Sequence, residues 1–382
     1  MKNLNLIFAW VCLLFISTAC NDVEPSISSL PVPTSKPYSI NREGYAYFRI
    51  PTMVITNSGT ILAFAEGRRN GPEDEGDIDI VLKRSTDKGK TWGPLITVKD
   101  DGENRCRNQV PVYLPDINRI ILLSCWNPGA TGTNSIFVTY SDDEGLTWAK
   151  EKDITASVTP DKYRWYATGP CHGIVKQFEP HKGRIVVPCN HNTTTSGAGR
   201  SHVIYSDDKG ETWHLGGIMD VDYTNESTVT ELSNGDLMLN MRKQSDTEKY
   251  RMVSTSTDGG LTWTSCKYTT LKEPICQGSI LFYGLGDDGK GIILFSNPDS
   301  QTNRNNNTLK MSEDDGVTWK KQYSYTGSDY GGYSDIARYP DGTIGVLYEY
   351  GFKNIGGIAF QNVELSQLLK YMTKIYILLI VM

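Results

Sequence analysis

Three arginines stand at positions where a cation needs a partner. Arg49 lies in the stretch FRIP, Arg242 ends the apolar run LMLNMR, and Arg304 follows the polar run SNPDSQTN. A guanidinium at the end of a strand in an apolar sheet is costly unless it is paired or holds an anion, so an ion pair and an anion-binding site are both explanations for these arginines. Any one of them alone is typical of an ordinary surface. The net charge of -6 would repel an anion, so such a site needs its own local group of arginines.

Acidic and phenolic side chains occupy loops from which they could act on a bound ligand. The Gly- and acid-rich loop GRRNGPEDEGDIDIV contains Asp74, Glu75 and Asp77. Glu226 lies in YTNESTV, a polar break before a strand, and Tyr333 follows two glycines in GGYSDIA. Loops often carry catalytic groups. Taken singly, a solvated acid or a packed tyrosine is the commoner explanation for each.

An eight-residue pattern, Ser-x-Asp-x-Gly-x-Thr-Trp, occurs five times, as STDKGKTW at 85, SDDEGLTW at 141, SDDKGETW at 206, STDGGLTW at 256 and SEDDGVTW at 312. In a tight turn, Asp can accept backbone N–H bonds and Gly can adopt a positive φ. Asp-x-Gly turns can also bind calcium, but each copy offers few acidic ligands. We therefore expect these Asp-boxes to be structural hairpin turns.

The spacing of the boxes, about 50 to 65 residues, is typical of a supersecondary unit repeated around an axis. Between them lie short β-branched runs bounded by turn residues, such as RIILLSCW, GRIVVPCN and GTIGVLYEY. No segment of comparable length has a convincing helical stripe. The sequence therefore predicts an all-β fold, a six-bladed β-propeller of four-stranded units with Asp-box turns.

The two ends of the chain have a different composition. Residues 1–20 resemble a secretory signal, with Lys2 before the apolar run LIFAWVCLLFI. The small residues before Cys20 resemble a bacterial lipobox, which predicts lipidation of Cys20, although cleavage as an ordinary signal peptide is the alternative. Residues 21–37 are expected to be an extended tether, 38–370 the propeller, and 371–382 an apolar tail too short to span a bilayer. We expect an exported protein, anchored by lipid to a bacterial membrane, periplasmic or on the cell surface.

The cysteines and the charge exclude several classes of function. Beyond the signal there are six cysteines, at positions 106, 125, 171, 189, 266 and 276. They allow 15 disulfide connectivities and their spacing selects none. There is no CxxC motif and the five histidines have no ligand spacing, so no metal and no cofactor are expected. The negative net charge argues against nucleic acid or an anionic membrane surface as a partner.

In combination, these motifs resemble the bacterial and animal exo-sialidases (neuraminidases). The resemblance covers about residues 38 to 365 and rests on FRIP, FAEGR, TGP, CQGS, YSD and LYE in that order, together with the five boxes. It implies a six-bladed propeller whose site removes a terminal sialic acid from sialylated glycans. It also implies that Arg49, Arg242 and Arg304 bind the carboxylate of the substrate, for which planar guanidinium groups are well suited.

The resemblance assigns further roles by motif position. Tyr333 is similar to the nucleophile, Glu226 to its general base and Glu349, in LYE, to the carboxylate that orients Arg49. Alignment of DIVLKRS with the corresponding strand of the family, extended back to the acid-rich loop, selects Asp74 as the acid/base. Asp77 and Glu75 are close competitors. The remaining residues with an expected place in the pocket are Arg68, which would contact the sugar hydroxyls, and Asn108 and Gln277, which would line it.

Three alternatives remain at this level. One is a propeller that binds sialylated glycans without cleaving them, which would require loss of the nucleophile or the acid. Another is transfer to a second sugar or an intramolecular product, and a third is a different 2-keto sugar acid as substrate. TGPCHG departs from the family because Cys171 stands where Gly is expected, which could alter a turn or crowd the pocket. The apolar C-terminus also puts the integrity of the last blade in doubt.

Overall fold

The computed structural model describes residues 33–128, 134–161, 163–193, 198–244, 247–351 and 354–368. The expected signal with Cys20, most of the expected tether and the apolar tail at 371–382 lie outside the described residues. None of the helices within the described part is long and apolar enough to cross a membrane.

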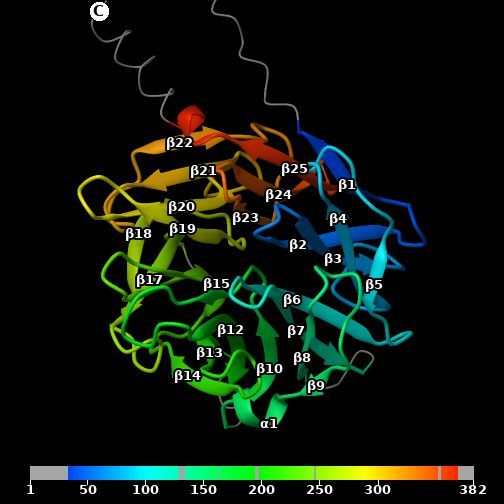
Figure 1. Ribbon diagram of the computed structural model, residues 1–382, viewed down its shortest axis with the longest axis horizontal. Coiled ribbons are helices and arrows are strands. Elements are labelled where there is room, and N and C mark those ends of the chain that lie inside the picture. Colours follow the sequence, from blue (N-terminus) through cyan, green and yellow to red (C-terminus); the bar gives the residue numbers. More distant parts are fainter. Residues whose placement is uncertain are drawn as a thin grey trace, which may run out of the picture. The chain divides into compact units, whose positions relative to one another are not determined.

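The described residues form five hydrogen-bonded sheets arranged as a β-propeller (Figure 1). The largest contains β2 (Tyr47–Ile55), β3 (Ile61–Arg68), β4 (Ile78–Ser85), β5 (Ile96–Lys99), β6 (Arg105–Leu114), β7 (Arg119–Asn127), β8 (Ser135–Ser141) and β9 (Lys152–Asp153). Its strands β2 to β5 and β6 to β9 are two antiparallel groups. A single parallel residue pair, Ile78 with Arg105, joins them through β4 and β6.

The other four sheets follow in chain order. One contains β10 (Tyr163–Thr168), β11 (Ile174–Val175), β12 (Ile185–Thr193), β13 (Gly199–Ser206) and β14 (His214–Ile218), and α1 (Thr155–Val158) precedes it. The next contains β15 (Thr224–Glu231), β16 (Leu237–Lys243), β17 (Tyr250–Ser256) and β18 (Lys267–Lys272). The third contains β19 (Ser279–Leu285), β20 (Gly291–Pro298), β21 (Asn307–Ser312) and β22 (Lys321–Ser324). The last contains β23 (Ser334–Arg338), β24 (Ile344–Tyr350), β25 (Gly357–Val363) and β1 (Ser35–Ser39).

The last sheet combines both ends of the described chain. Strand β1 pairs antiparallel with β25, so that Tyr38 lies opposite Ile358. This pairing covers an edge of β25 that would otherwise be exposed. Residues 35–37, expected to belong to the tether, are therefore part of the sheet.

The innermost strands of the propeller begin at the same end of its central axis. In Figure 1, β2, β6, β15, β19 and β23 lie nearest the centre. Arg49 is near the start of β2, Glu226 near the start of β15, and Tyr333 directly precedes β23. The inner strands therefore bring residues from distant parts of the sequence to the same mouth.

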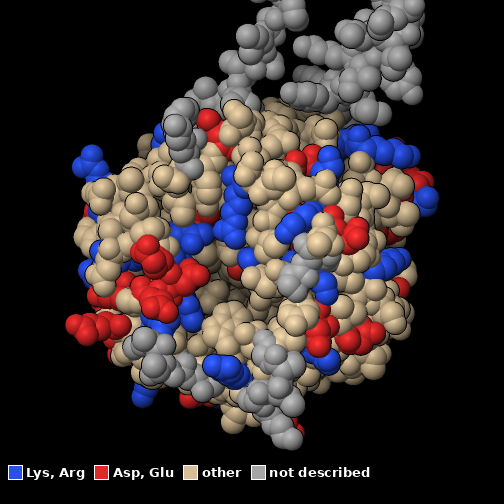
Figure 2. All heavy atoms as spheres, turned by 180° about the vertical axis from the view of Figure 1, so that it is seen from behind, with Lys and Arg blue, Asp and Glu red and all other residues tan. Residues whose placement is uncertain are grey.

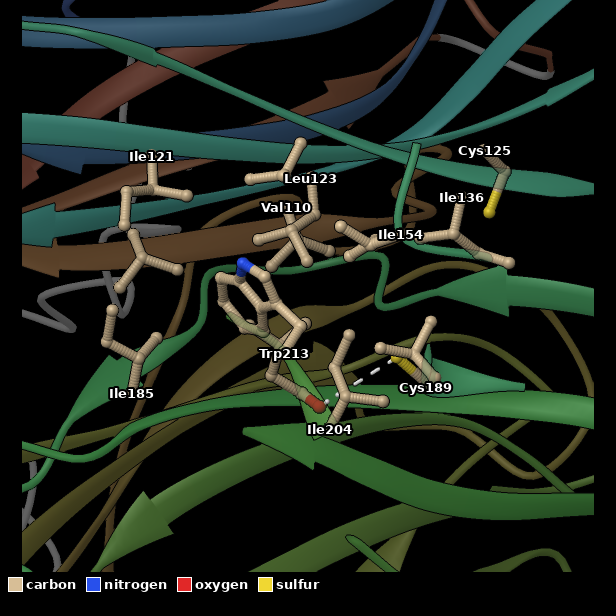
Figure 3. Close-up of a cluster of buried hydrophobic side chains, with 14 of the residues drawn as sticks. Val110, Ile121, Leu123, Cys125, Ile136, Ile154, Ile185, Cys189, Ile204 and Trp213 are labelled. Atoms are coloured by element: carbon tan, nitrogen blue, oxygen red, sulfur yellow. Dashed lines mark hydrogen bonds between the residues drawn. The ribbon is translucent and has the colours of Figure 1, made fainter. Parts of the chain in front are cut away.

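Apolar side chains fill the space between neighbouring sheets. In one cluster Trp213 packs against Val110 and Ile121 of the second strand group and Ile185 and Ile204 of the following sheet (Figure 3). Trp213 is the last residue of an Asp-box, and it is almost completely buried. The indole of this box therefore joins one sheet to the next.

The Asp-boxes are turns, as the sequence predicts. In the second box, Asp143 Oδ1 accepts hydrogen bonds from Ser141 Oγ at 2.7 Å and the backbone N–H of Thr147 at 2.9 Å, and Oδ2 accepts one from Thr147 Oγ1. Asp87, Asp208, Asp258 and Asp314 make the same bonds in their boxes. Both carboxylate oxygens thus serve the turn. Among the described residues no group of three or more His, Cys, Asp or Glu could hold a metal ion.

The glycine of a box makes a close contact with the neighbouring sheet, which predicts a stability effect. Gly145 has a φ of 85°, and a Cβ there would lie 2.6 Å from Leu62 Cδ2. Gly59 has the same φ of 85° but open space around it. Both alanine variants incur the strain of a positive φ, about 1 kcal/mol. Because Leu62 is fully buried, Gly145→Ala should lose a further 1–3 kcal/mol or so through overpacking. Equal losses in urea unfolding of the two variants would contradict this packing.

Two buried histidines predict a loss of stability in acid. His191 Nδ1 lies 3.1 Å from His202 Nδ1, and His202 Nε2 lies 3.0 Å from the Tyr166 hydroxyl. Burial lowers the pKa of His191 from 6.5 to about 4 and that of His202 well below its ordinary value. The unfolded chain therefore binds more protons between pH 4 and 6.5, and stability falls as the pH is lowered through this window.

The expected slope is at most about 1.4 kcal/mol per pH unit for each histidine. Asp79 acts in the opposite sense, because burial raises its pKa to about 6. Comparing the wild type with His191→Gln at pH 4.5 and pH 7 separates the two effects, since Asp79 is common to both. The variant should lose less stability in acid, and an equal loss would contradict this account.

All six cysteines in the described residues are free thiols, and five of them are buried. Cys171 occupies the position where Gly was expected. Its thiol contacts the backbone oxygens of His172 at 3.3 Å and Ser227 at 3.4 Å. The side chain thus lies in the interior between the TGPCHG segment and β15.

Candidate active site

The three arginines come together around a single phenol. The guanidinium carbon of Arg49 lies 5.6 Å from the centre of the Tyr333 ring, and that of Arg304 lies 5.4 Å from it. Arg242 Nη1 lies 3.3 Å from the Tyr333 hydroxyl oxygen. These residues come from β2, the loop between β20 and β21, and the end of β16. The arrangement concentrates positive charge at one mouth of the propeller.

Tyr333 is hydrogen-bonded to a carboxylate. Its hydroxyl donates a short hydrogen bond to Glu226 Oε1, while Arg242 Nη1 donates to Glu226 Oε2 at 2.5 Å. Burial and the negative charge of Glu226 raise the pKa of Tyr333 well above its ordinary value, and Arg242 opposes this only in part. The phenol is therefore neutral at rest, with a proton acceptor already in contact.

Glu349 holds Arg49 in place from the protein interior. It is completely buried, with Oε1 3.1 Å from Arg49 Nε and 3.2 Å from the backbone N of Ile50. Its other oxygen accepts from the Tyr330 hydroxyl at 3.1 Å and from the backbone N of Tyr333 at 3.2 Å. Burial alone would raise the pKa of Glu349, but the charges of Arg49 and Arg304 and the backbone N–H groups of Ile50 and Tyr333 lower it. The carboxylate is thus ionised and fixes both the arginine and the tyrosine.

Asp74 reaches the same cluster from the acid-rich loop. Its carboxylate lies 2.8 Å from Arg68 Nη2 and 3.8 Å from Arg49 Nη1, and its side chain is 70% exposed. Partial removal of the carboxyl group from water would raise the pKa of Asp74, but the charges of Arg68 and Arg49 outweigh it and lower the pKa. A bound anion that neutralised Arg49 would relieve part of that effect. Asp74 would then hold a proton more readily.

The competing acids are placed differently. Asp77 pairs with Arg69 at 3.2 Å on the far side of the loop, and Glu75 makes no ion pair among those found in the described residues. Asp74 is therefore the acid of this loop that contacts the arginine cluster. The sequence alone could not distinguish Asp74 from Asp77, because which of the two meets the arginines depends on how the loop turns.

The remaining predicted residues lie around the cluster in different roles. Arg68 is buried and bonds to Glu66 and Asp74. The backbone N of Asn108 donates to Glu66 at 3.0 Å, and its side chain is half-buried. Gln277 is buried, and its amide bonds to the backbone oxygens of Pro170 and Ser334, both at 3.0 Å. The Gln277 amide thus links the chain segments that contain Pro170 and Ser334.

Sequence reasoning missed three residues at this mouth. Tyr330 donates a hydrogen bond to Glu349, and its position three residues before Tyr333 could have marked it as a site residue. Cys276 packs with Ile50 and Tyr333, and burial raises the pKa of its thiol to about 11 against the opposing effect of Arg304. Arg107 bonds to the backbone of Asp74. For Arg107 no local pattern gave a signal.

A separate cavity of about 940 Å³ lies at the opposite ends of the inner strands. It is lined by residues such as Ile55, Glu231 and Tyr339. Its buried Lys176 is already paired with Glu231 at 2.6 Å. None of the three clustered arginines lines this cavity. We therefore place the candidate site at the arginine mouth.

The surface view shows a face of the domain that is hollowed near its centre (Figure 2). Basic side chains border the hollow, and acidic side chains gather beside it. Charges of both signs on one rim are compatible with a polar, anionic ligand. Fold and site together define a β-propeller with three clustered arginines and a phenol–carboxylate pair at one mouth.

Comparison with known proteins identifies the group to which this propeller belongs. The BNR repeat-like domain family matches residues 59–346. A sialidase of Micromonospora viridifaciens is 33% identical over 90% of this chain and 56% of its own length. A sialidase of Clostridium perfringens is 32% identical over 83% of this chain and 88% of its own. The chain belongs to the sialidase family with BNR repeats.

Solved structures agree with this assignment. The Hadza microbial sialidase Hz136 has a TM-score of 0.76 at 31% identity, over 85% of this chain and 67% of that one. The intramolecular trans-sialidase from Ruminococcus gnavus, in complex with oseltamivir carboxylate, has a TM-score of 0.74 at 21% identity, over 85% and 96%. At that identity the likeness is evidence for the fold alone. The chain spans little more than half the length of the Micromonospora relative.

Proposed function

We propose that this chain is an exo-α-sialidase that hydrolyses terminal sialic acid from sialylated glycans with retention of configuration. The observation that carries the proposal is the contact of Tyr333 with Glu226 and Arg242, surrounded by Arg49 and Arg304. Guanidinium forks suit the planar carboxylate on the reacting carbon of sialic acid. The similarity of this chain to proteins that are named sialidases supports the same activity.

The resting geometry supports the following first chemical step. Tyr333 Oη forms a bond to the anomeric carbon, and its proton passes to Glu226 Oε1. The bond from that carbon to the leaving oxygen breaks with its electron pair, and the oxygen takes a proton from Asp74. A neutral phenol suits this role because the substrate's carboxylate would repel an anionic nucleophile.

The second step reverses these transfers. The Asp74 carboxylate takes a proton from water as the water oxygen attacks the anomeric carbon. The bond to Tyr333 Oη breaks, and the phenol recovers its proton from Glu226. Two displacements at one carbon retain its configuration.

We also propose the finer architecture and the location of the protein. The single residue pair between β4 and β6 supports counting the eight-stranded sheet as two blades, which gives six. The N-terminal sequence supports export and a lipid anchor at Cys20 on a bacterial membrane.

The leaving-group dependence of Asp74→Asn tests the proposal. The purified protein should release both the fluorophore from an aryl α-sialoside and sialic acid from sialyllactose. The variant should lose about 10²-fold or more in kcat on sialyllactose, whose leaving oxygen needs a proton. It should keep most activity on the aryl sialoside, because the phenolate leaves unaided. Binding of sialyllactose by a folded wild type without turnover of either substrate would favour a non-catalytic glycan-binding propeller.

An intramolecular trans-sialidase is a second candidate, because the fold is shared with one. Its product would be an anhydro sugar instead of free sialic acid. Analysis of the released product distinguishes the two reactions.

A further inference from the structure

The loop that carries Asp74 connects β3 to β4 and is held mainly by side chains. The backbone oxygens of three consecutive residues, Pro72, Glu73 and Asp74, all accept hydrogen bonds from guanidinium groups. Arg68 Nη1 donates to Pro72 and, at 2.8 Å, to Glu73. These two bonds fix the loop just before the acid.

The third oxygen is held from a different strand group. Arg107 Nη1 donates to the backbone oxygen of Asp74 at 3.0 Å, and Arg105 Nη1 approaches it at 3.4 Å. Arg107 is only 8% exposed. The register of β6 with β7 shifts between Arg107 and Val110, and Asn108 there has a φ of 55°. A bulge of this kind redirects neighbouring side chains.

Arg107 and Arg68 act on different parts of Asp74. Arg68 contacts both the loop and the carboxylate of Asp74, with 2.8 Å from Nη2 to Oδ1. Arg107 contacts the backbone oxygen alone. The Asp74 side chain is 70% exposed, so little packing would otherwise define its direction. The direction of the carboxylate therefore depends on its ion pair with Arg68 and on the position of its own backbone.

We propose that Arg107 is a positioning residue, which holds the backbone of Asp74 so that its carboxylate meets the leaving oxygen of the substrate. The proposal rests on the proposed sialidase function, in which Asp74 is the acid/base. Proton transfer requires hydrogen-bond distance between donor and acceptor. A shift of about 1 Å in such a group can cost on the order of 10²-fold in rate.

A double-mutant cycle tests the role. We compare the wild type, Arg107→Met, Asp74→Asn and the double variant on sialyllactose and on an aryl α-sialoside. Arg107→Met should lose about 10- to 100-fold in kcat on sialyllactose and less than about threefold on the aryl sialoside, whose departure needs little acid help. In the Asp74→Asn background the same substitution should cause no further loss on sialyllactose, because the group it positions is absent.

The charge of Arg107 also contributes to the lowered pKa of Asp74, and the pH profile separates that effect. Loss of charge alone would raise the pKa of Asp74, moving a limb of the profile and leaving its plateau intact. Misplacement lowers the plateau. Arg107→Lys retains the charge without the guanidinium geometry, so it should show the lower plateau and an unmoved limb.

Arg119→Met serves as the matched control, because Arg119 begins β7 at the other end of the same hairpin and pairs with Asp142 at the surface. It should leave both substrates unaffected. Equal losses by Arg107→Met on both substrates, or a full further loss in the Asp74→Asn background, would overturn the proposal. If the wild type turns over neither substrate, the sialidase function itself fails, which is a distinct result.

Discussion

Replacing Tyr333 by Phe should lower turnover of an aryl α-sialoside by on the order of 10³-fold or more. The substitution removes one oxygen, which bonds to Glu226 and lies 3.3 Å from Arg242. The ring, which packs with Ile50 and Cys276, remains. Binding of the substrate carboxylate should persist because the three arginines are untouched. The proposed nucleophile is the only group lost.

Steady-state kinetics and binding of a non-hydrolysable sialic acid analogue measure the two effects separately. Tyr330→Phe is the matched control, because it removes a neighbouring phenol oxygen that contacts Glu349 and not Glu226. It should retain far more turnover than Tyr333→Phe. Comparable activity in Tyr333→Phe and the wild type would refute a phenol nucleophile.

Replacing Glu349 by Ala should produce the largest loss of stability among the site variants, about 3–5 kcal/mol. Glu349 is completely buried and accepts four hydrogen bonds, from Arg49, Ile50, Tyr330 and Tyr333. Without it, the one ion pair left to the buried Arg49 within the described residues is that with the exposed Asp74 at 3.8 Å. The cost of that unpaired charge dominates the expected loss.

Urea unfolding measures this loss, and Glu313→Ala is the control. Glu313 pairs with Lys321 at the surface at 2.7 Å, where such pairs contribute about 0–1 kcal/mol. A loss of less than about 1 kcal/mol in Glu349→Ala would mean that Arg49 does not depend on this carboxylate for its counter-charge. The KM of any folded variant should also rise, since Arg49 would lose its orientation.

Repetition made the fold predictable from the sequence. Five copies of one turn, each with Asp, Gly and Trp in fixed places, gave the hairpins, and the structure confirms their hydrogen bonds. Strand β1 was not predicted, because SKPYS is short and polar. Its pairing with β25 depends on a partner more than 300 residues away.

The site was predictable where a residue type is rare in its surroundings. Arg49, Arg242 and Arg304 were singled out as costly cations, and the structure brings them around Tyr333. The direction of a side chain was not predictable. Gln277, expected in the pocket, bonds to backbone oxygens, and Arg107 reaches Asp74 through a bulge that no sequence pattern marks.

The most direct test of the central proposal is proton NMR of sialyllactose during digestion by the purified chain, recorded before the product equilibrates. The account predicts that the α-anomer of free sialic acid appears first, because two displacements at one carbon retain its configuration. Initial release of the β-anomer would contradict the phenol nucleophile. Initial release of an anhydro sugar would replace hydrolysis by the intramolecular reaction, and no release by the folded protein would contradict the enzyme assignment.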